Sequence, residues 1–226
     1  MDLSVIIPVY NEVKTIEEVI TRVQNTGFAS EIVLVDDGST DGSTEILKKY
    51  QGKEGFQVIL CEKNGGKGSA VREGIKAAKS TYAIIQDADF EYDPQDYAKL
   101  MPVIKSGQAD VVYGSRFMEN TDVFYFRSLA ANKLLTFLTN ILYHTKLTDM
   151  ETCYKLFKVA DVREIPLHSR RFEFEPELTT KLLKRGYKIV EVPISYSGRS
   201  YDEGKKIKPK DGFIALWTLF KYRFVD

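Results

Sequence analysis

The first 90 residues alternate four times between a short apolar run and a segment with helical periodicity. The runs are rich in Val and Ile, and they cover residues 3–9, 31–36, 56–61 and 82–85. They are too uniformly hydrophobic for strands that expose one face to water. Between the first two runs, apolar residues recur at helical spacing from Ile16 to Val23. Strands that alternate with helices favour a parallel, doubly wound sheet, so the sequence predicts an α/β fold.

The second half of the chain continues this alternation less regularly. A fifth strand is expected at residues 110–116, a loop at 118–127 and a helix at 128–143. Further strands are expected at 150–157 and 188–193, with a helix at 170–183 between them. We therefore expect a mostly parallel central sheet flanked by helices.

Two carboxylates one residue apart follow the fourth apolar run. Asp87 and Asp89 can face one ligand, because side chains two apart on an extended backbone point to the same side. Their mutual repulsion would raise one pKa unless a cation lies between them. Carboxylate oxygens suit Mg²⁺ or Mn²⁺, and Glu91 offers a third carboxylate nearby. The alternative is a solvated turn before the helix cap at Asp93.

Other polar residues follow the neighbouring runs. Tyr10 and Asp37 come at the ends of the first and second runs, as Asp87 and Asp89 do at the fourth. In open parallel sheets, ligands bind beyond the carboxyl ends of the strands. We therefore expect these side chains to line one crevice. The glycine-rich segment 64–69 contains Lys67 but matches no phosphate-loop pattern, so it is either a helix-start turn or a ligand contact.

Composition excludes several classes of protein. The 32 basic and 32 acidic residues balance, so no overall field favours nucleic acid. Cys61 and Cys153 form no disulfide framework, which fits a reducing compartment, and His144 and His168 form no zinc pair. We expect no secretory signal, because the apolar run at residues 5–9 is too short and no basic residue precedes it. We expect no membrane span, because the C-terminal apolar run 213–220 is far shorter than the roughly 20 residues that a span needs.

The C-terminal tail differs in character from the rest. Basic residues between 205 and 210 precede Phe213, Trp217 and Phe220, which lie at helical spacing. Such a helix either packs in the core or lies as an amphipathic helix on an anionic bilayer. We divide the chain into a catalytic region, 1–198, and a basic lid with an amphipathic helix, 199–226, within the same domain.

Three motifs together carry a family resemblance. They are Ser4–Glu12 (SVIIPVYNE), Val35–Asp41 (VDDGSTD) and Gln86–Asp89 (QDAD), in that order. This set resembles the signatures of family 2 glycosyltransferases with the Rossmann-like GT-A fold, over residues 3 to 116. The chain also resembles, more loosely, the polyprenyl-phosphate branch of this family, the dolichol-phosphate mannose synthases. The residues that carry this looser resemblance are Gly114–Arg116, Arg127, Thr148–Asp149 and the segment 192–205.

The resemblance implies an inverting, metal-dependent transfer of a hexose from a nucleotide sugar to a polyprenyl or dolichyl phosphate. It favours GDP-mannose as donor, with UDP-glucose next, and Mg²⁺ or Mn²⁺ as cofactor. The implied location is peripheral, on the cytoplasmic face of the membrane. The nucleobase and the sugar of the donor stay open, as does the oligomeric state.

The resemblance also implies roles for individual residues. Asp89 would hold the metal on the diphosphate, with Asp87 and Glu91 as further candidate ligands. Asp87, Asp89, Arg116 and Arg127 would be catalytic. The residues implied to bind the nucleotide sugar are Pro8, Tyr10, Glu12, Asp37, Lys67, Asp87, Ala88, Asp89, Arg199 and Lys205.

Two alternatives remain open on the sequence. The first is transfer to a hydroxyl group of a soluble sugar or polysaccharide, which would require a general base such as Asp149, Glu151 or Glu173. The chain departs from the branch here, since Glu173 stands in place of a Lys and Met150–Cys153 in place of a small-residue turn. The second alternative is a nucleotide-sugar-binding module without turnover.

Overall fold

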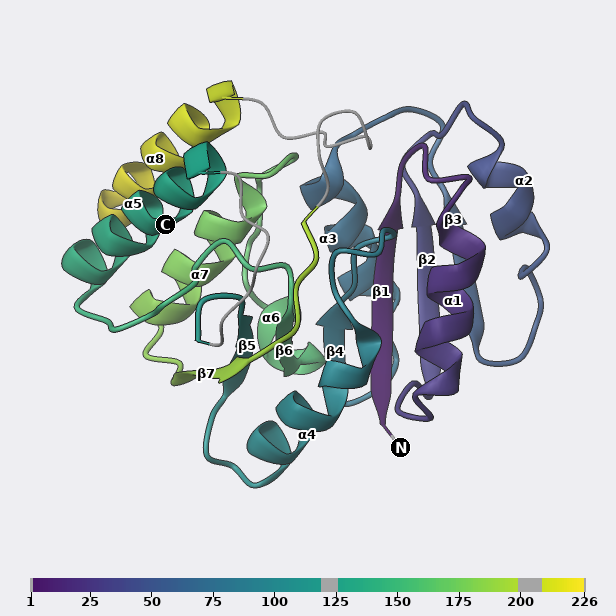
Figure 1. Cartoon of the computed structure of the whole chain (residues 1–226), viewed down its shortest axis with the longest axis horizontal. Helices are drawn as coiled ribbons and strands as arrows, with labels where there is room; N and C mark the ends of the chain where they lie inside the picture. Colours follow the sequence, from purple (N-terminus) through teal and green to yellow (C-terminus); the bar gives the residue numbers. More distant parts are fainter. Residues whose placement is uncertain (1, 119–125, 199–208, 226) are drawn as a thin grey trace.

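Seven strands form one mixed, mostly parallel sheet, which confirms the predicted α/β fold (Figure 1). The computed structural model describes residues 2–118, 126–198 and 209–225, with only the backbone of 126–128 and 209. The strand order is β3-β2-β1-β4-β6-β5-β7. The strands are β1 (Leu3–Val9), β2 (Glu31–Asp36), β3 (Phe56–Leu60), β4 (Tyr82–Ile85), β5 (Val111–Ser115), β6 (Lys155–Lys158) and β7 (Ile189–Pro193).

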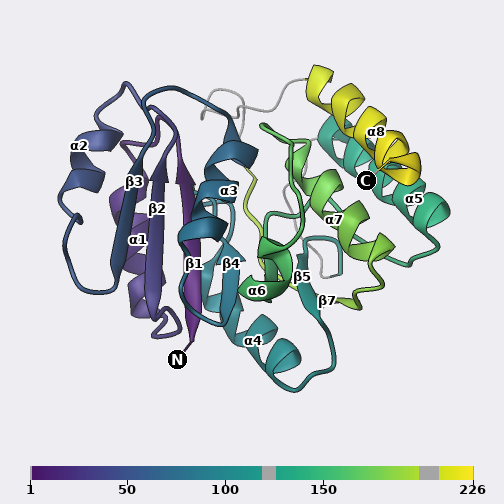
Figure 2. The ribbon, with the colours of Figure 1, turned by 180° about the vertical axis from the view of Figure 1, so that it is seen from behind.

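Helices cover both faces of this sheet. Helix α1 lies in front of the first strands in Figure 1, whereas α3 and α6 come to the front in the reverse view of Figure 2. The helices are α1 (Ile16–Asn25), α2 (Ser43–Lys48), α3 (Lys67–Ala77), α4 (Tyr97–Lys105), α5 (Phe126–Tyr143), α6 (Val159–Arg163), α7 (Phe174–Lys184) and α8 (Pro209–Phe224), with a 3₁₀ turn η1 (Pro94–Asp96).

The core surrounds the central strands. The apolar side chains of β1 other than Pro8 are fully buried, as expected for a strand covered on both faces. Helix α3 packs closely on β1, because Gly74 has no side chain and a Cβ there would lie 2.3 Å from Cγ2 of Ile6. This packing fixes the start of α3, and therefore Lys67, relative to the end of β1.

Strand β6 runs antiparallel to both of its neighbours, β4 and β5. The sequence predicted a strand over 150–157, which is wrong at its start, because side chains satisfy the polar groups that precede β6. The Thr152 hydroxyl donates to the Gly114 carbonyl at 2.6 Å, and the Cys153 N–H donates to the Tyr92 hydroxyl at 3.1 Å. Residues before β6 therefore lie at the sheet edge where β4 and β5 end.

Helix α7 begins later than the sequence predicted. The residues before it form a turn, in which the Glu173 carboxylate accepts from the backbone N–H groups of Arg170 and Arg171 at 3.0 and 3.2 Å. A side chain that binds its own preceding backbone competes with helix formation there. Glu173 thus has a local structural role before α7.

Helices α5 and α8 lie side by side in both views and form a second packed layer with α7 (Figures 1 and 2). A small core joins them, built from Leu135, Leu147, Met150, Ala215 and Leu219. The outward side of the pair is apolar and exposed, and we call it the apolar face: Leu134, Phe137, Ile141, Phe213, Ile214, Trp217, Phe220 and Phe224. Helix α8 therefore packs against the protein on one side, where Leu219 is buried, and exposes the other, where Trp217 is 67% exposed. Contact of the exposed side with a bilayer stays a prediction.

Among the described residues, no helix is both long enough and apolar enough to cross a bilayer. The proposed basic lid falls on residues 199–208, which lie outside the described residues.

Candidate active site

The turn after β4 presents the two carboxylates of the aspartate motif. Oδ1 of Asp89 accepts from the Glu91 N–H at 3.0 Å, which fixes the carboxylate within the turn. The Ala88 carbonyl accepts from the Thr15 hydroxyl at 2.7 Å, so the start of the first helical segment supports the same turn. Asp89 is 7% exposed. The turn is therefore ordered by backbone contacts.

Asp87 begins a chain of ion pairs that is partly exposed at Asp87 and Lys67 and buried at Glu175 and Lys155. Nζ of Lys67 lies 2.8 Å from Oδ1 of Asp87 and 3.6 Å from Oε1 of Glu175. Oε2 of Glu175 lies 2.5 Å from Nζ of Lys155, which is fully buried. Four charges thus alternate in sign, in the order Asp87, Lys67, Glu175, Lys155.

Lys67 remains charged in this setting. Burial alone lowers the pKa of its ammonium group, but Asp87 and Glu175 more than offset that effect, so the pKa is raised well above its usual value. A lysine held beside Asp87 at the start of α3 can stabilise negative charge on a bound diphosphate. Its place in the site agrees with its predicted nucleotide-sugar role, which stays a prediction.

Asp37 holds the glycine-rich segment in place. Its two carboxylate oxygens accept from the N–H groups of Gly65 and Gly66, at 2.7 and 2.8 Å. Burial raises the pKa of Asp37, and these two hydrogen bonds partly offset the effect. Gly66 has φ +95°, and a Cβ there would lie 2.4 Å from the carbonyl oxygen of Arg170. Only glycine fits this contact between the segment and the turn before α7.

The end of β1 places the other predicted nucleoside residues. Pro8 and Tyr10 are half-buried, and Asn11 adopts a left-handed φ of +52°. Glu12 is nearly buried, and its carboxylate accepts from the Thr15 hydroxyl at 3.1 Å. Because Thr15 also binds Ala88, the ends of β1 and β4 are tied together. The structure thus brings the first and third motifs to one edge, as the sequence predicted.

Arg116 lies at the end of β5 and is paired with Asp149. The pair is bidentate, with Nε to Oδ2 at 2.7 Å and Nη2 to Oδ1 at 2.8 Å, and both side chains are buried. The guanidinium also lies over the Tyr196 ring, 5.2 Å from its centroid. Glu191 fixes the Asp149 loop by accepting from the N–H groups of Thr148 and Asp149 at 2.6 and 2.8 Å.

Glu151 is a carboxylate of this region whose pKa lies near neutrality. Burial raises its pKa to about 7, Lys155 and Arg116 act against the shift, and Glu175 and Asp149 add to it. Its Oε1 is buried without a hydrogen-bond partner. A carboxyl group in this state exchanges a proton near neutral pH.

The three candidate metal ligands have separate surroundings. Asp87 pairs with Lys67, Asp89 accepts from the backbone, and Oε2 of Glu91 accepts from the Tyr196 hydroxyl at 2.9 Å. Within residues 2–118, 126–198 and 209–225, no three His, Cys, Asp or Glu side chains gather as a metal-binding group. An ion held by one or two carboxylates and completed by substrate phosphates fits this arrangement, as is usual for Mg²⁺.

Three predicted cations are not placed by the structure. The side chain of Arg127 lies outside the described residues, as do Arg199 and Lys205 altogether. Their phosphate contacts stay predictions.

Three functional candidates were not expected from the sequence: Lys155, Glu175 and Tyr196. Lys155 had a signal, since a lysine between Tyr154 and Leu156 interrupts an otherwise apolar strand. Such a charge within a core strand needs a buried partner. No comparable signal points to Tyr196, because its contact with Glu91 spans 105 positions.

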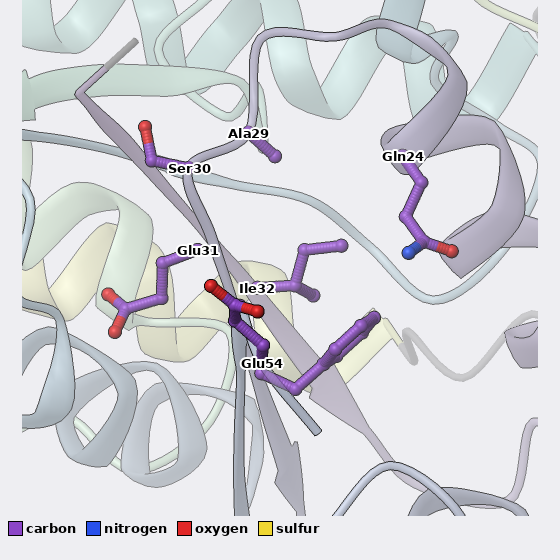
Figure 3. A pocket seen from close by; sticks show the side chains of 8 residues that line it. Gln24, Ala29, Ser30, Glu31, Ile32 and Glu54 are labelled. Atoms are coloured by element: carbon purple, nitrogen blue, oxygen red, sulfur yellow. The ribbon is translucent and has the colours of Figure 1, made fainter.

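A pocket lies at the opposite end of the sheet (Figure 3). It surrounds the starts of β2 and β3, and its lining residues are Gln24, Ala29, Ser30, Glu31, Ile32, Glu54, Gly55 and Phe56. The lining includes two carboxylates and no cation, so it does not suit a nucleotide diphosphate. The functional edge is therefore the one with Asp87, Asp89 and Arg116.

Several solved structures share this fold. Glucosyl-3-phosphoglycerate synthase from Mycobacterium tuberculosis aligns over 100% of this chain and 81% of its own, with a TM-score of 0.76 and 20% identity. The same protein has been crystallised in complex with Mn²⁺, uridine diphosphate and phosphoglyceric acid. At this identity the likeness establishes the GT-A fold.

Sequence comparisons identify relatives and the family. A dolichol-phosphate mannosyltransferase of Pyrococcus furiosus is 31% identical over 98% of this chain, which spans 62% of that protein's length. An uncharacterized protein of Methanocaldococcus jannaschii is 32% identical over 96% of this chain and 90% of its own. The family model described as glycosyl transferase family 2 matches residues 4–165. The motifs, the strand-end carboxylates and this match agree, and the chain belongs to glycosyl transferase family 2.

Proposed function

We propose that this enzyme transfers a hexose from a nucleotide sugar to a polyprenyl or dolichyl phosphate, with inversion at the anomeric carbon. GDP-mannose is the favoured donor and UDP-glucose the next. The observation that carries the proposal is the apolar face of α5 and α8, which stands beside the site. Met150 packs in the small core beneath this face, and its chain neighbours Asp149 and Glu151 belong to the site.

The apolar face suits a lipid-bearing substrate. Large contiguous apolar patches on monomers mark protein or membrane contacts. Exposed Lys210, Lys221 and Arg223 lie on the same helix, which favours an anionic bilayer surface. We infer that the enzyme docks peripherally on the cytoplasmic face of a membrane. The names of two relatives, dolichol-phosphate mannosyltransferase and dodecaprenyl-phosphate galacturonate synthase, agree with a lipid phosphate acceptor.

The donor half of the site positions the leaving group. A divalent ion held by Asp89, with Asp87 nearby, would supply positive charge for the departing diphosphate. Lys67 adds a fixed cation at the start of α3 and keeps the Asp87 carboxylate in place. Asp37 orders the glycine-rich segment beside the nucleoside site. These groups lower the energy of the charge that develops on the leaving group.

The acceptor half orients a nucleophile. The second pKa of a phosphate monoester is near 6, so its oxygen is already a nucleophile at neutral pH. That oxygen forms the bond to the anomeric carbon while the bond to the diphosphate breaks, and the electron pair leaves with the nucleoside diphosphate. Such an acceptor requires positioning and no proton removal, whereas a hydroxyl acceptor requires a base.

A substrate panel tests the proposal. Purified enzyme with Mg²⁺ or Mn²⁺ is given GDP-mannose or UDP-glucose, with a short polyprenyl phosphate, a soluble sugar or no acceptor. We expect a glycosyl phospholipid to form only with the polyprenyl phosphate. Transfer to the soluble sugar alone would establish the hydroxyl alternative. Donor binding without any transfer or hydrolysis would establish a binding module.

Liposome flotation tests the membrane contact. The double variant Phe213→Glu/Trp217→Glu should lose flotation with anionic liposomes, because it places two charges on the apolar face. Met118→Glu changes an exposed apolar residue outside this face and serves as the control. Unchanged flotation of the double variant would contradict the docking.

A further inference from the structure

Glu151 has a carboxyl group without a committed partner in a region where the neighbouring charges are already paired. Its Oε1 is buried and accepts no hydrogen bond. Nζ of Lys155 donates to the carbonyls of Met150 and Thr152 and to Glu175, which uses all three of its protons. The guanidinium of Arg116 binds Asp149 through two nitrogens. Neither nearby cation is therefore directed at Glu151.

Burial is the main reason that Glu151 binds a proton near neutral pH. The groups that face it are the cations Lys155 and Arg116 and the carboxylates Glu175 and Asp149. With burial as the largest cause, they leave the pKa of Glu151 at about 7. Any further anion that arrives nearby raises this pKa again.

The topology places Glu151 between the end of β4 and the end of β5. It precedes β6, which lies between β4 and β5 and runs antiparallel to both. The segment 149–153 therefore stands at the edge where β4 ends in the donor carboxylates and β5 ends in Arg116. Met150, beside it, packs beneath the apolar face. Glu151 therefore directly follows a residue that packs beneath the apolar face, and that residue in turn follows Asp149, which binds Arg116.

We propose that Glu151 binds the acceptor phosphate as a neutral carboxyl group, donating its O–H to a phosphate oxygen. The inference rests on the proposed function and assigns a residue for the acceptor phosphate. A protonated carboxyl is a hydrogen-bond donor and carries no charge to repel a dianion. A carboxylic acid kept neutral to donate such a bond is a known use of a raised pKa. The proton stays on Glu151 throughout the transfer.

The other two candidate bases, Asp149 and Glu173, already have hydrogen-bond or ion-pair partners. Asp149 is bound to Arg116, and Glu173 accepts from two backbone N–H groups before α7. If the acceptor were a hydroxyl, Glu151 would be the remaining group to remove its proton. The donor role and the base role require opposite protonation states, so one substitution separates them.

The test compares Glu151→Gln with Glu151→Ala in steady-state transfer to a short polyprenyl phosphate. The glutamine side chain keeps the size and an N–H donor, so we expect kcat and the acceptor KM within about threefold of wild type. Alanine removes the donor, so we expect the acceptor KM to rise about tenfold or more with the donor KM unchanged. Glu164→Gln, at an exposed glutamate, is the matched control. Thermal unfolding checks that each variant is folded.

The pH profile supplies a second readout. For wild type, kcat/KM for the acceptor should fall above about pH 7, as the free enzyme loses the Glu151 proton. In Glu151→Gln this fall should be absent, because the amide does not titrate. A loss of about a hundredfold in kcat for Glu151→Gln would overturn the proposal and make Glu151 a base. Wild-type behaviour of Glu151→Ala would overturn it as well.

The two proposals fail in different ways. If wild-type enzyme transfers only to hydroxyl groups, the proposed function fails and this inference fails with it. If wild type forms the glycosyl phospholipid and the Glu151 variants do not behave as expected, only this inference fails.

Discussion

The two halves of the site differ in how deeply their ion pairs are buried and in which carboxylates the backbone holds. In the half proposed to bind the donor, around β1, β2 and β4, backbone N–H groups hold Asp37 and Asp89, and the ion pair of Asp87 with Lys67 is partly exposed. In the half proposed to bind the acceptor, around β5, β6 and α7, the ion pairs are buried, as in Arg116 with Asp149 and Lys155 with Glu175.

The difference has an energetic consequence. A carboxylate held by backbone can lose its charge and still accept the same hydrogen bond. A buried ion pair that loses one partner leaves an uncompensated charge, at a cost of about 3–5 kcal/mol. Substitutions in the donor half should therefore reduce turnover, whereas those in the acceptor half should reduce stability.

The largest effect on stability is expected for Lys155→Met. The change leaves Glu175 without its buried partner at 2.5 Å and leaves two backbone carbonyls without a donor. We expect the free energy of unfolding to fall by about 3–5 kcal/mol, measured by urea denaturation. The control is Glu18→Gln, which breaks an exposed pair with Arg22 and should change stability by less than about 1 kcal/mol. Equal losses in both variants would remove the distinction between the two halves.

The largest effect on turnover is expected for Asp89→Asn. The amide oxygen can still accept from the Glu91 N–H, so the turn and the stability should be preserved, whereas a charged metal ligand is lost. We expect kcat/KM to fall about a hundredfold or more. Calorimetry should also show that Mn²⁺ no longer strengthens the binding of a nucleoside diphosphate to the variant. Full wild-type activity in excess chelator would contradict the metal role.

An acid-dependent loss of stability is expected from Glu177, in the acceptor half. Burial opposes its ionisation, but hydrogen bonds from Lys181, Ser169 and His168 lower its pKa from 4.5 to about 2. A lowered pKa in the folded state contributes stability that is present above pH 4.5 and lost as pH falls towards 2.

Glu177→Gln tests this contribution, which is about 3 kcal/mol. The difference in unfolding free energy between wild type and variant should be largest above pH 4.5 and shrink towards pH 2. Urea denaturation across this range measures it. A difference that does not change with pH would assign the loss to packing alone.

The smallest effect is expected where the halves meet, at Gly66. A Cβ at Gly66 would lie 2.4 Å from the Arg170 carbonyl, so Gly66→Ala must displace the turn before α7 as well as adopt a positive φ. We expect a loss of about 2 kcal/mol together with a raised donor KM. Gly52→Ala has a similar φ of +75° and nothing within 4 Å, so it measures the backbone cost alone. Equal losses would show that the contact contributes nothing.

The donor half was predictable from the sequence because its signals are local. Strands β1, β2 and β4 appear as apolar runs; Asp37 directly follows β2, and Asp87 and Asp89 lie in the turn after β4. The acceptor half depends on distant pairings that no local pattern encodes, such as Glu175 with Lys155 and Glu91 with Tyr196. The direction of β6 is equally non-local, because a short apolar run reads the same in either orientation. Helical spacing likewise predicted α8 without distinguishing Leu219, which is buried, from Trp217, which is not.

The reversed direction of β6 bears on how such an enzyme can change in evolution. The segment 149–153 lies before the N-terminal end of β6, whereas the carboxylates proposed to bind the donor lie after the C-terminal ends of parallel strands. Both lie at the same edge of the sheet. Insertions or replacements before β6 can therefore reshape the acceptor side without shifting the register of β1, β2 and β4. One half of the sheet can be inherited unchanged while the other is adapted to a new acceptor.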